Sequence, residues 1–112
     1  MSNPKTDLIH GTLEMLVLKT LSLGPLHGYG IAQHIQRLSA DVLRVEEGSL
    51  YPALQRLQAK RWVASEWKET PTKRRARYYR LTAAGTRQLG VEESSFARTM
   101  RAIGRVMRAS EA

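Results

Sequence analysis

The residues that decide the fold are Glu46–Trp62, EEGSLYPALQRLQAKRW. Their apolar members recur at i, i+4 and i+7, the spacing of one buried helix face: Leu50, Leu54 and Leu57. Proline has no N–H and is tolerated only within the first helical turn, so Pro52 places the N-cap at Gly48 or Ser49. The stretch therefore predicts a helix with one leucine side and one polar side.

Two shorter helices are predicted before this stretch. Apolar residues at helical spacing predict an amphipathic helix over residues 11–22, which Gly24 and Pro25 end. A second helix should begin near Gly28 and end near Ser39, with a buried stripe of Ile31, Ile35 and Leu38. The residues after it include one very short predicted strand, Leu43 to Val45. Residues 1–9 are expected to form a loose arm.

Two stretches after the central helix favour strands. Trp62–Glu69 (WVASEWKE) and Arg77–Leu81 (RYYRL) are rich in aromatic and β-branched residues, and each is too short for a helix. The seven residues between them contain Pro71 and a run of basic side chains, which predicts a hairpin with a mobile, basic tip. Tyr79 shares the parity of Leu81 on its strand, so we expect its ring to face the core. We expect the two tryptophans to pack within the hairpin.

A long helix should follow, with Thr82 as its N-cap. Three glycines weaken it, so it should lean on a partner. Its residues at alternating spacings of four and three form a heptad seam: Leu89, Glu93, Phe96, Met100, Ile103 and Met107. Packing on its own domain would explain the stripe as well, but the helix follows a complete small domain, so we expect self-association. The arginines beside the seam should stay solvated: Arg98, Arg101, Arg105 and Arg108.

The composition limits the class of partner. The 112 residues carry a formal net charge of +8, with a pI of about 10.5, which is the electrostatic footprint of a nucleic-acid binder. No cysteine is present, so disulfides and thiolate metal sites are excluded. The first residues lack the features of a signal peptide, and the longest apolar stretch is too interrupted to span a bilayer. We therefore expect a cytoplasmic protein without a membrane partner.

The order helix, helix, helix, hairpin, long helix predicts a mainly α fold with a small β-hairpin wing: a winged helix-turn-helix plus a long C-terminal dimerisation helix. Residues 1–82 would bind DNA and residues 83–112 would pair two chains. On the third helix, glutamine and arginine suit base edges, whereas serine and tyrosine suit phosphate. The predicted contacts there are Ser49, Tyr51, Pro52, Gln55 and Arg56. The predicted wing contacts are Lys73, Arg74, Arg75 and Arg77.

Three stretches together resemble the PadR-like transcriptional regulators: GTLEMLVLKTLSLGPLHGYGIAQHI, EEGSLYPALQRLQAKRWV and RRARYYRLTAAG. The resemblance covers about residues 8–90. It implies a winged-helix repressor that is dimeric through its C-terminal helix and binds a double-stranded DNA operator. The chain has one predicted C-terminal helix, and in this it resembles the shorter subfamily. The matching positions are Tyr51, Pro52 and Leu54 on the recognition helix and Arg75, Tyr78, Tyr79 and Thr82 around the wing.

Some members of that family respond to phenolic acids, antibiotics or other small aromatics. The resemblance therefore implies a small aromatic or hydrophobic effector as a further partner, which would relieve operator binding. A drug-binding subset stacks its ligand on a tryptophan of the C-terminal helix. In this chain the aromatic residue on that helix is Phe96, which departs from that pattern.

Other functions have weaker support in the sequence. His10, His27 and His34 lack accompanying carboxylates or cysteines, so we expect no metal, and His27 should stabilise a turn. Glu46 and Glu47 suit a favourable interaction with a helix N-terminus better than acid–base catalysis. No nucleophile with a base and an orienting group is recognisable, so we expect no enzyme and no cofactor. The alternatives are a small-molecule-sensing or protein-interaction module with incidental DNA contact, or an RNA binder without the usual exposed aromatic platform.

Overall fold

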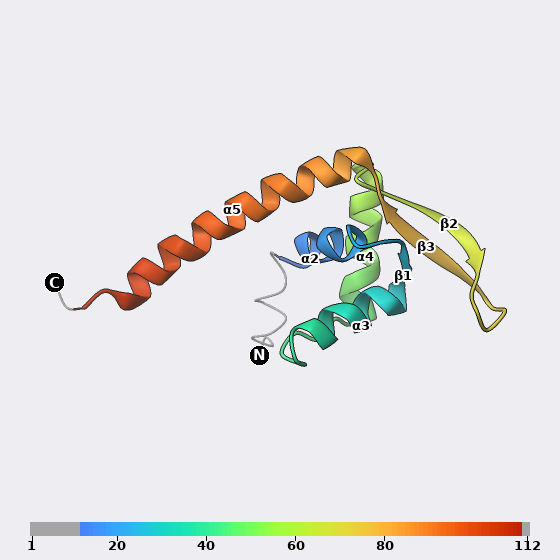
Figure 1. The fold of residues 1–112 in the computed structure, drawn as a ribbon, viewed down its shortest axis with the longest axis horizontal. Helices are drawn as coiled ribbons and strands as arrows, with labels where there is room; N and C mark the ends of the chain where they lie inside the picture. The colour runs from blue at the N-terminus through green and yellow to red at the C-terminus, as the bar shows by residue number, and fades with distance from the viewer. Residues whose placement is uncertain (1–11, 111–112) are drawn as a thin grey trace.

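The computed structural model describes residues 12–110, so the expectations for residues 1–9 and His10 lie outside the described residues. Figure 1 shows a small helical domain from which a hairpin and a long helix extend in different directions. The elements in chain order are α2 (Leu13–Leu21), β1 (Leu26–His27), α3 (Gly28–Leu38), α4 (Glu47–Ala59), β2 (Val63–Glu69), β3 (Arg75–Leu81) and α5 (Ala83–Arg108). The predicted fold class, a mainly α winged helix with a long C-terminal helix, is confirmed.

One core holds the helices and the sheet together. α2 contacts α3, α4, α5 and β3, so it lies at the centre of the domain. The leucine face of α4 is buried as predicted, since Leu50, Leu54 and Leu57 are each at most 1% exposed. Burying a leucine side chain contributes roughly 1.5–3 kcal/mol. The rest of the core comes from all parts of the chain: Leu13, Val17, Leu18, Leu21, Ile31, Ile35, Ala53, Val63, Tyr79 and Leu89.

The two helices before α4 lie close to their predicted bounds. Gly24, with φ of +144°, forms the turn after α2. His27 is the N-cap of α3, because its Nδ1 accepts a hydrogen bond of 3.0 Å from the Gly30 amide. The prediction that Leu38 is buried is wrong. It is the last residue of α3, beyond the core, and is 68% exposed.

The predicted N-cap of α4, Gly48 or Ser49, is also wrong: the N-cap is Glu46, two or three residues earlier. The helix begins at Glu47, where the Leu50 amide donates to the Glu46 carbonyl oxygen at 2.9 Å and closes the first turn. Pro52 is therefore inside the helix and removes the hydrogen bond that would have reached the Gly48 carbonyl oxygen. Burial of Leu50 and Leu54 on either side of Pro52 offsets the lost hydrogen bond. A prediction based on proline alone does not take that burial into account.

The segment between α3 and α4 contains no strand among residues 39–46, contrary to prediction. Ala40 and Asp41 have φ values of +53° and +66°, which turn the chain out of the extended conformation. The Leu43 amide donates to Ser39 Oγ at 3.0 Å and holds the turn. Leu43 and Val45 are half-buried against the core instead of paired with a neighbouring strand.

The sheet has three antiparallel strands in the order β1-β3-β2. β2 and β3 form the predicted hairpin, and Tyr79 faces the core as expected, at 6% exposure. β1 was not predicted: its two residues pair with β3 in the register Leu26↔Tyr79 and His27↔Tyr78. Two residues are too few to show an alternating pattern, so this strand had no sequence signal.

The hairpin turn is shorter than predicted and is held by hydrogen bonds of its own. The Lys73 amide donates to the Thr70 carbonyl oxygen at 2.8 Å, and the Arg74 amide donates to Thr70 Oγ1 at 3.1 Å. β3 begins at Arg75, two residues before the predicted strand. Arg75 is therefore a strand residue, and the turn itself carries Lys73 and Arg74.

α5 begins in the domain and ends outside it. Thr82 caps it as predicted, with Oγ1 accepting from the Gly85 amide at 3.0 Å. Its 26 residues extend about 39 Å at 1.5 Å per residue, and only Gly85 and Leu89 are buried. Leu89 was predicted to lie in the seam, but it belongs to the core of its own domain. Among residues 12–110, every helix is too short or too polar to cross a membrane.

Gly85 is required by packing, so its replacement should destabilise the fold. A Cβ at this position would collide with the Trp62 carbonyl oxygen and lie 2.8 Å from Leu81 Cδ1. We expect Gly85→Ala to lower the free energy of unfolding by about 1–3 kcal/mol in urea denaturation. Gly90→Ala is the matched control in the same helix. Its Cβ would meet no atom within 4 Å, so it should stabilise by up to about 1 kcal/mol. Equal effects of the two substitutions would contradict the packing role of Gly85.

Candidate nucleic-acid interface

The exposed side of α4 is opposite its leucines. It consists of Gly48, Tyr51, Pro52, Gln55 and Ala59. Gln55 lies near the middle of this side, and its amide forms no hydrogen bond with any of residues 12–110. Pro52 and Ala59, about one turn to either side of Gln55, are small. A free amide on the exposed strip of such a helix can reach base edges in the major groove.

Arg56 and Ser49 lie on the flank of this strip. Arg56 Nε donates to Glu14 Oε2 of α2 at 2.7 Å, and Lys60 Nζ lies 3.8 Å from the other oxygen of the same carboxylate. Arg56, which was predicted to contact bases, is therefore engaged within the chain, although about half of its side chain is exposed. Ser49 is exposed in the first turn, but it is not the N-cap, which is Glu46.

A cleft of about 770 Å³ separates α4 from the hairpin. Tyr51 forms one side of it, and Trp67, Arg75 and Arg77 form the other. Tyr79 lies at its base, where burial raises the pKa of its hydroxyl and the nearby Arg77 guanidinium acts in the opposite direction. The cleft is thus aromatic and positively charged, and it adjoins the exposed strip of α4.

Tyr51 is held in this cleft by the start of α3. A Cβ at Gly28 would lie 2.7 Å from the Tyr51 hydroxyl oxygen, so the absence of a side chain there leaves room for the ring. The ring is 40% exposed. The phenol is therefore fixed at the edge of α4 and remains accessible from outside.

The basic residues of the hairpin are exposed and free of carboxylates. Lys73, Arg74, Arg75 and Arg77 have no carboxylate oxygen within 4.0 Å among the residues that the structure describes. Lys68, on the other face of the hairpin, is 3.5 Å from Glu66. The positive charge of the tip and inner face is therefore available to an external anion.

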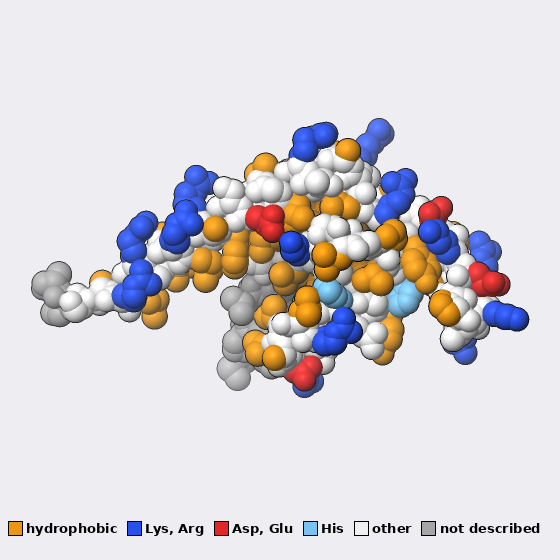
Figure 2. Space-filling model, in the orientation of Figure 1, with side chains coloured by type: hydrophobic (Ala, Val, Ile, Leu, Met, Phe, Trp, Pro, Cys, Tyr) orange, Lys and Arg blue, Asp and Glu red, His pale blue; other side chains and the backbone are white. Residues whose placement is uncertain are grey.

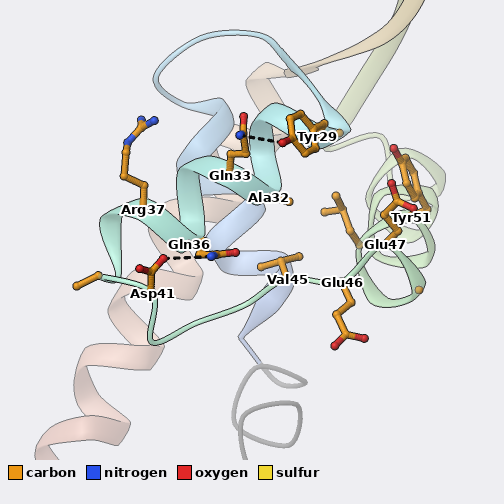
Figure 3. Close-up of a pocket in the computed structure, with 14 residues that line it drawn as sticks. Tyr29, Ala32, Gln33, Gln36, Arg37, Asp41, Val45, Glu46, Glu47 and Tyr51 are labelled. Carbon is orange, nitrogen blue, oxygen red and sulfur yellow. Dashed lines mark hydrogen bonds between the residues drawn. The ribbon is translucent and has the colours of Figure 1, made fainter.

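A second hollow, of about 820 Å³, lies between α3 and the start of α4 (Figure 3). Its rim carries three carboxylates, those of Asp41, Glu46 and Glu47, and the basic residue Arg37. Gln36 Nε2 donates to Asp41 Oδ1 at 3.1 Å inside it. Carboxylates repel phosphate, so this hollow is a poorer surface for a polyanion than the basic cleft on the hairpin side of α4. Tyr51 lines both hollows and marks the boundary between them.

Two exposed aromatic residues beside the cleft were not predicted as functional. Trp67 was expected to pack within the hairpin, but it is 54% exposed and lies under two arginines instead of in a core. Tyr29, in the first turn of α3, is 64% exposed and accepts a hydrogen bond from Gln33 at 3.1 Å. For Trp67 a signal existed: setting the hairpin register places it opposite Arg77.

The outer part of α5 has an apolar side and a basic side. Phe96, Met100, Ile103 and Met107 are between 40% and 77% exposed. Figure 2 shows hydrophobic side chains along one edge of this helix and Lys or Arg side chains along the other. Glu93, the charged member of the predicted seam, lies 3.9 Å from Lys19 of α2. The described part of one chain leaves the apolar side uncovered.

The residues that the structure describes contain no group of three or more histidines, aspartates or glutamates able to hold a metal ion. His27 has a structural role as a helix cap. Its ring also lies edge-on to Tyr78, with centroids 5.4 Å apart. It therefore links the sheet to α3.

A protruding hairpin, an exposed helix and a basic cleft between them define a winged helix-turn-helix DNA-binding protein. The model of the transcriptional regulator PadR-like family matches residues 17–91 of the 112. The chain therefore belongs to the PadR-like family of DNA-binding transcriptional regulators.

Several individual proteins are similar to this chain. A PadR family transcriptional regulator from Eggerthella lenta is 31% identical, with a TM-score of 0.79 over 93% of this chain and 88% of that one. A transcriptional regulator from Clostridium thermocellum is 27% identical, with a TM-score of 0.81 over 88% and 96%. An uncharacterized 37.1 kDa protein of a Streptomyces fradiae transposon is 45% identical over 76% of this chain. The match spans only 23% of that relative's length.

Gly48 has no role in the fold that would require glycine, so its replacement should separate stability from DNA binding. A Cβ there would meet no atom within 4 Å. We expect Gly48→Ala to raise the free energy of unfolding by up to about 1 kcal/mol. If the exposed side of α4 enters a DNA groove, the added methyl on that side should weaken DNA binding, measured by fluorescence anisotropy. Gly90→Ala should stabilise without weakening binding. Unchanged affinity in Gly48→Ala would place this turn away from DNA.

Proposed function

We propose that the protein is a homodimeric repressor that binds a double-stranded DNA operator through α4 and the hairpin wing. The observation that carries this proposal is the position of Gln55, a free amide at the middle of the exposed side of α4, next to a cleft lined by unpaired arginines. Glutamine can donate and accept with adenine in the major groove. Repression itself rests on the family resemblance, and no catalytic role is proposed.

The proposed DNA contacts divide into two kinds. Gln55 reads base edges, with Pro52 and Gly48 allowing close approach. Phosphate contacts come from the flank and the wing: Ser49, Tyr51, Arg56, Lys73, Arg74, Arg75 and Arg77. If the four wing cations without a carboxylate partner (Lys73, Arg74, Arg75 and Arg77) each neutralise one phosphate per half-site, the logarithm of the binding constant should fall with the logarithm of salt concentration with a slope of about −7.

The second proposed element is a dimer through the apolar side of α5. Phe96, Met100, Ile103 and Met107 continue the heptad spacing beyond the domain, and their exposure supports a partner helix. Residues 1–82 then bind DNA and residues 83–112 pair the chains, although the first two turns of α5 share the core of the DNA-binding unit. Two recognition helices would contact half-sites about 10 bp apart, or a multiple of that spacing.

A small aromatic or hydrophobic effector is the third element of the proposal. A cavity of about 390 Å³ at the junction of α2 and α5 supports it, with Met15, Val91 and Phe96 among its lining residues. An occupant would shift the angle at which α5 leaves the domain, and hence the spacing of the two recognition helices.

The exposed apolar side of α5 also favours the alternative function, a sensing or protein-interaction module with incidental DNA contact. That alternative predicts that selection from random oligonucleotides enriches no motif.

Two substitutions test the division of roles. Gln55→Ala should change the selected DNA motif and cost about 1–3 kcal/mol at one base position. Arg74→Ala should weaken all sequences alike and make the salt slope less steep by about 1 for each half-site. DNA-site selection measures the change of motif, and anisotropy titrations at several salt concentrations measure the affinity and the salt slope. An unchanged motif in Gln55→Ala, or a flat salt response in the wild type, would refute the assignment.

A charge in the α5 seam should separate the dimer. Met100→Arg places a cation on the apolar side, where a partner helix would bury it, so we expect monomers by sedimentation. Ala102→Arg is the matched control, because it adds the same charge to the opposite, solvated side. A dimer mass that survives Met100→Arg would contradict α5 as the interface.

A further inference from the structure

The inner face of the wing carries a stack of one tryptophan and two arginines. Arg75 Cζ lies 5.6 Å and Arg77 Cζ lies 5.5 Å from the centroid of the Trp67 ring. Trp67 pairs with Arg77 in the hairpin register, so the three side chains lie on the same face of the sheet as Tyr79, which is buried. This Trp67 stack extends the core face of the sheet beyond the core and into solvent.

The stack holds the arginines without neutralising them. Arg77 Nε donates to Ser65 Oγ at 2.9 Å, and neither guanidinium has a carboxylate within 4.0 Å among residues 12–110. The contrast with Arg56 is informative, because its charge is matched by Glu14. An aromatic face attracts a guanidinium but leaves its N–H donors free. Two oriented cations with free donors are suited to an anion with several oxygens.

The opposite side of the same cleft supplies further donors. Tyr51 projects from α4, and Tyr29 from the first turn of α3. The cleft is open to solvent, and its volume of about 770 Å³ exceeds the size of a single ion, so it has room for a phosphodiester group. Aromatic walls also suit the apolar faces of a sugar.

We propose that this cleft seats a phosphodiester group of one DNA strand between Tyr51 and the Arg75 and Arg77 guanidiniums, with Trp67 as the residue that positions both arginines. This inference rests on the proposed function. A free arginine loses side-chain freedom when it binds, and the stack removes part of that loss in advance. Trp67 therefore acts on affinity for every sequence and contributes no base preference.

Trp67→Ala should weaken binding to operator and to random duplex DNA by a similar factor, about tenfold. The salt slope should stay unchanged, since the number of cations is the same. Trp67→Phe should restore most of the affinity, because a smaller aromatic ring still carries the arginines. Circular dichroism and urea unfolding establish that each variant is folded.

The positioning role has a sharper readout in a double-mutant cycle. If Trp67 acts through the arginines, adding Trp67→Ala to the Arg75→Ala/Arg77→Ala protein should cause no further loss. A full tenfold further loss would overturn the positioning role. Wild-type affinity in Trp67→Ala itself would overturn the whole inference. A wild-type protein that binds no DNA would instead refute the proposed function.

Tryptophan fluorescence gives a test that does not require a variant with reduced DNA affinity. The chain has two tryptophans, so Trp62→Phe leaves Trp67 as the only one. Its emission should change on addition of duplex DNA, and its quenching by acrylamide should decrease, because the strand covers the exposed ring. Emission and quenching that stay the same at saturating DNA would contradict a strand in the cleft.

Discussion

The rotation of α4 about its own axis is the constraint on which the rest of the structure depends. Leu50, Leu54 and Leu57 are buried almost completely, and a turn of the helix by one residue would expose them at a cost of several kcal/mol. With the leucines fixed, Gln55 faces outward and Tyr51 faces the wing. The position of each side chain that we assign to DNA contact follows from packing that involves no DNA.

The wing is tied to that helix through the core. Tyr79 is at once a strand residue, a core residue and the base of the cleft, so the sheet is held at a set distance from α4. β1 adds a second link, because His27 pairs with β3 and also caps α3. The cleft between α4 and the wing is therefore a product of the domain's own folding. Its shape is available before any ligand arrives, which favours binding without a large loss of conformational freedom.

The sequence predicted those features that depend on local periodicity. Leucine spacing gave the buried face of α4, strand parity gave the inward Tyr79, and Thr82 before a long helical pattern gave the cap of α5.

Features that depend on distant partners were missed. Glu14 is 42 residues from Arg56, and no local pattern shows that the two would pair. Leu89 fits the heptad spacing of the predicted seam, but it packs in the core of its own domain. Heptad spacing does not show where a helix leaves the core, so it does not show which of its residues are free to contact another chain. The early start of α4 was missed because a local rule for proline was given more weight than the burial of four neighbouring side chains. Within the predicted interface, the exposed positions of Gln55 and the wing arginines agree with prediction, whereas their use in DNA binding remains a proposal.

The most direct test of the account is to map which DNA positions lie next to α4. The chain contains no cysteine, so Gln55→Cys provides a single site for a DNA-cleaving reagent. Cuts should be confined to two short regions of the operator, about one helical turn apart or a multiple of it, and the same reagent at Ala102→Cys on α5 should give none there. Cleavage from position 55 that is absent or spread evenly along the duplex, while the protein stays bound, would contradict the claim that α4 enters the groove.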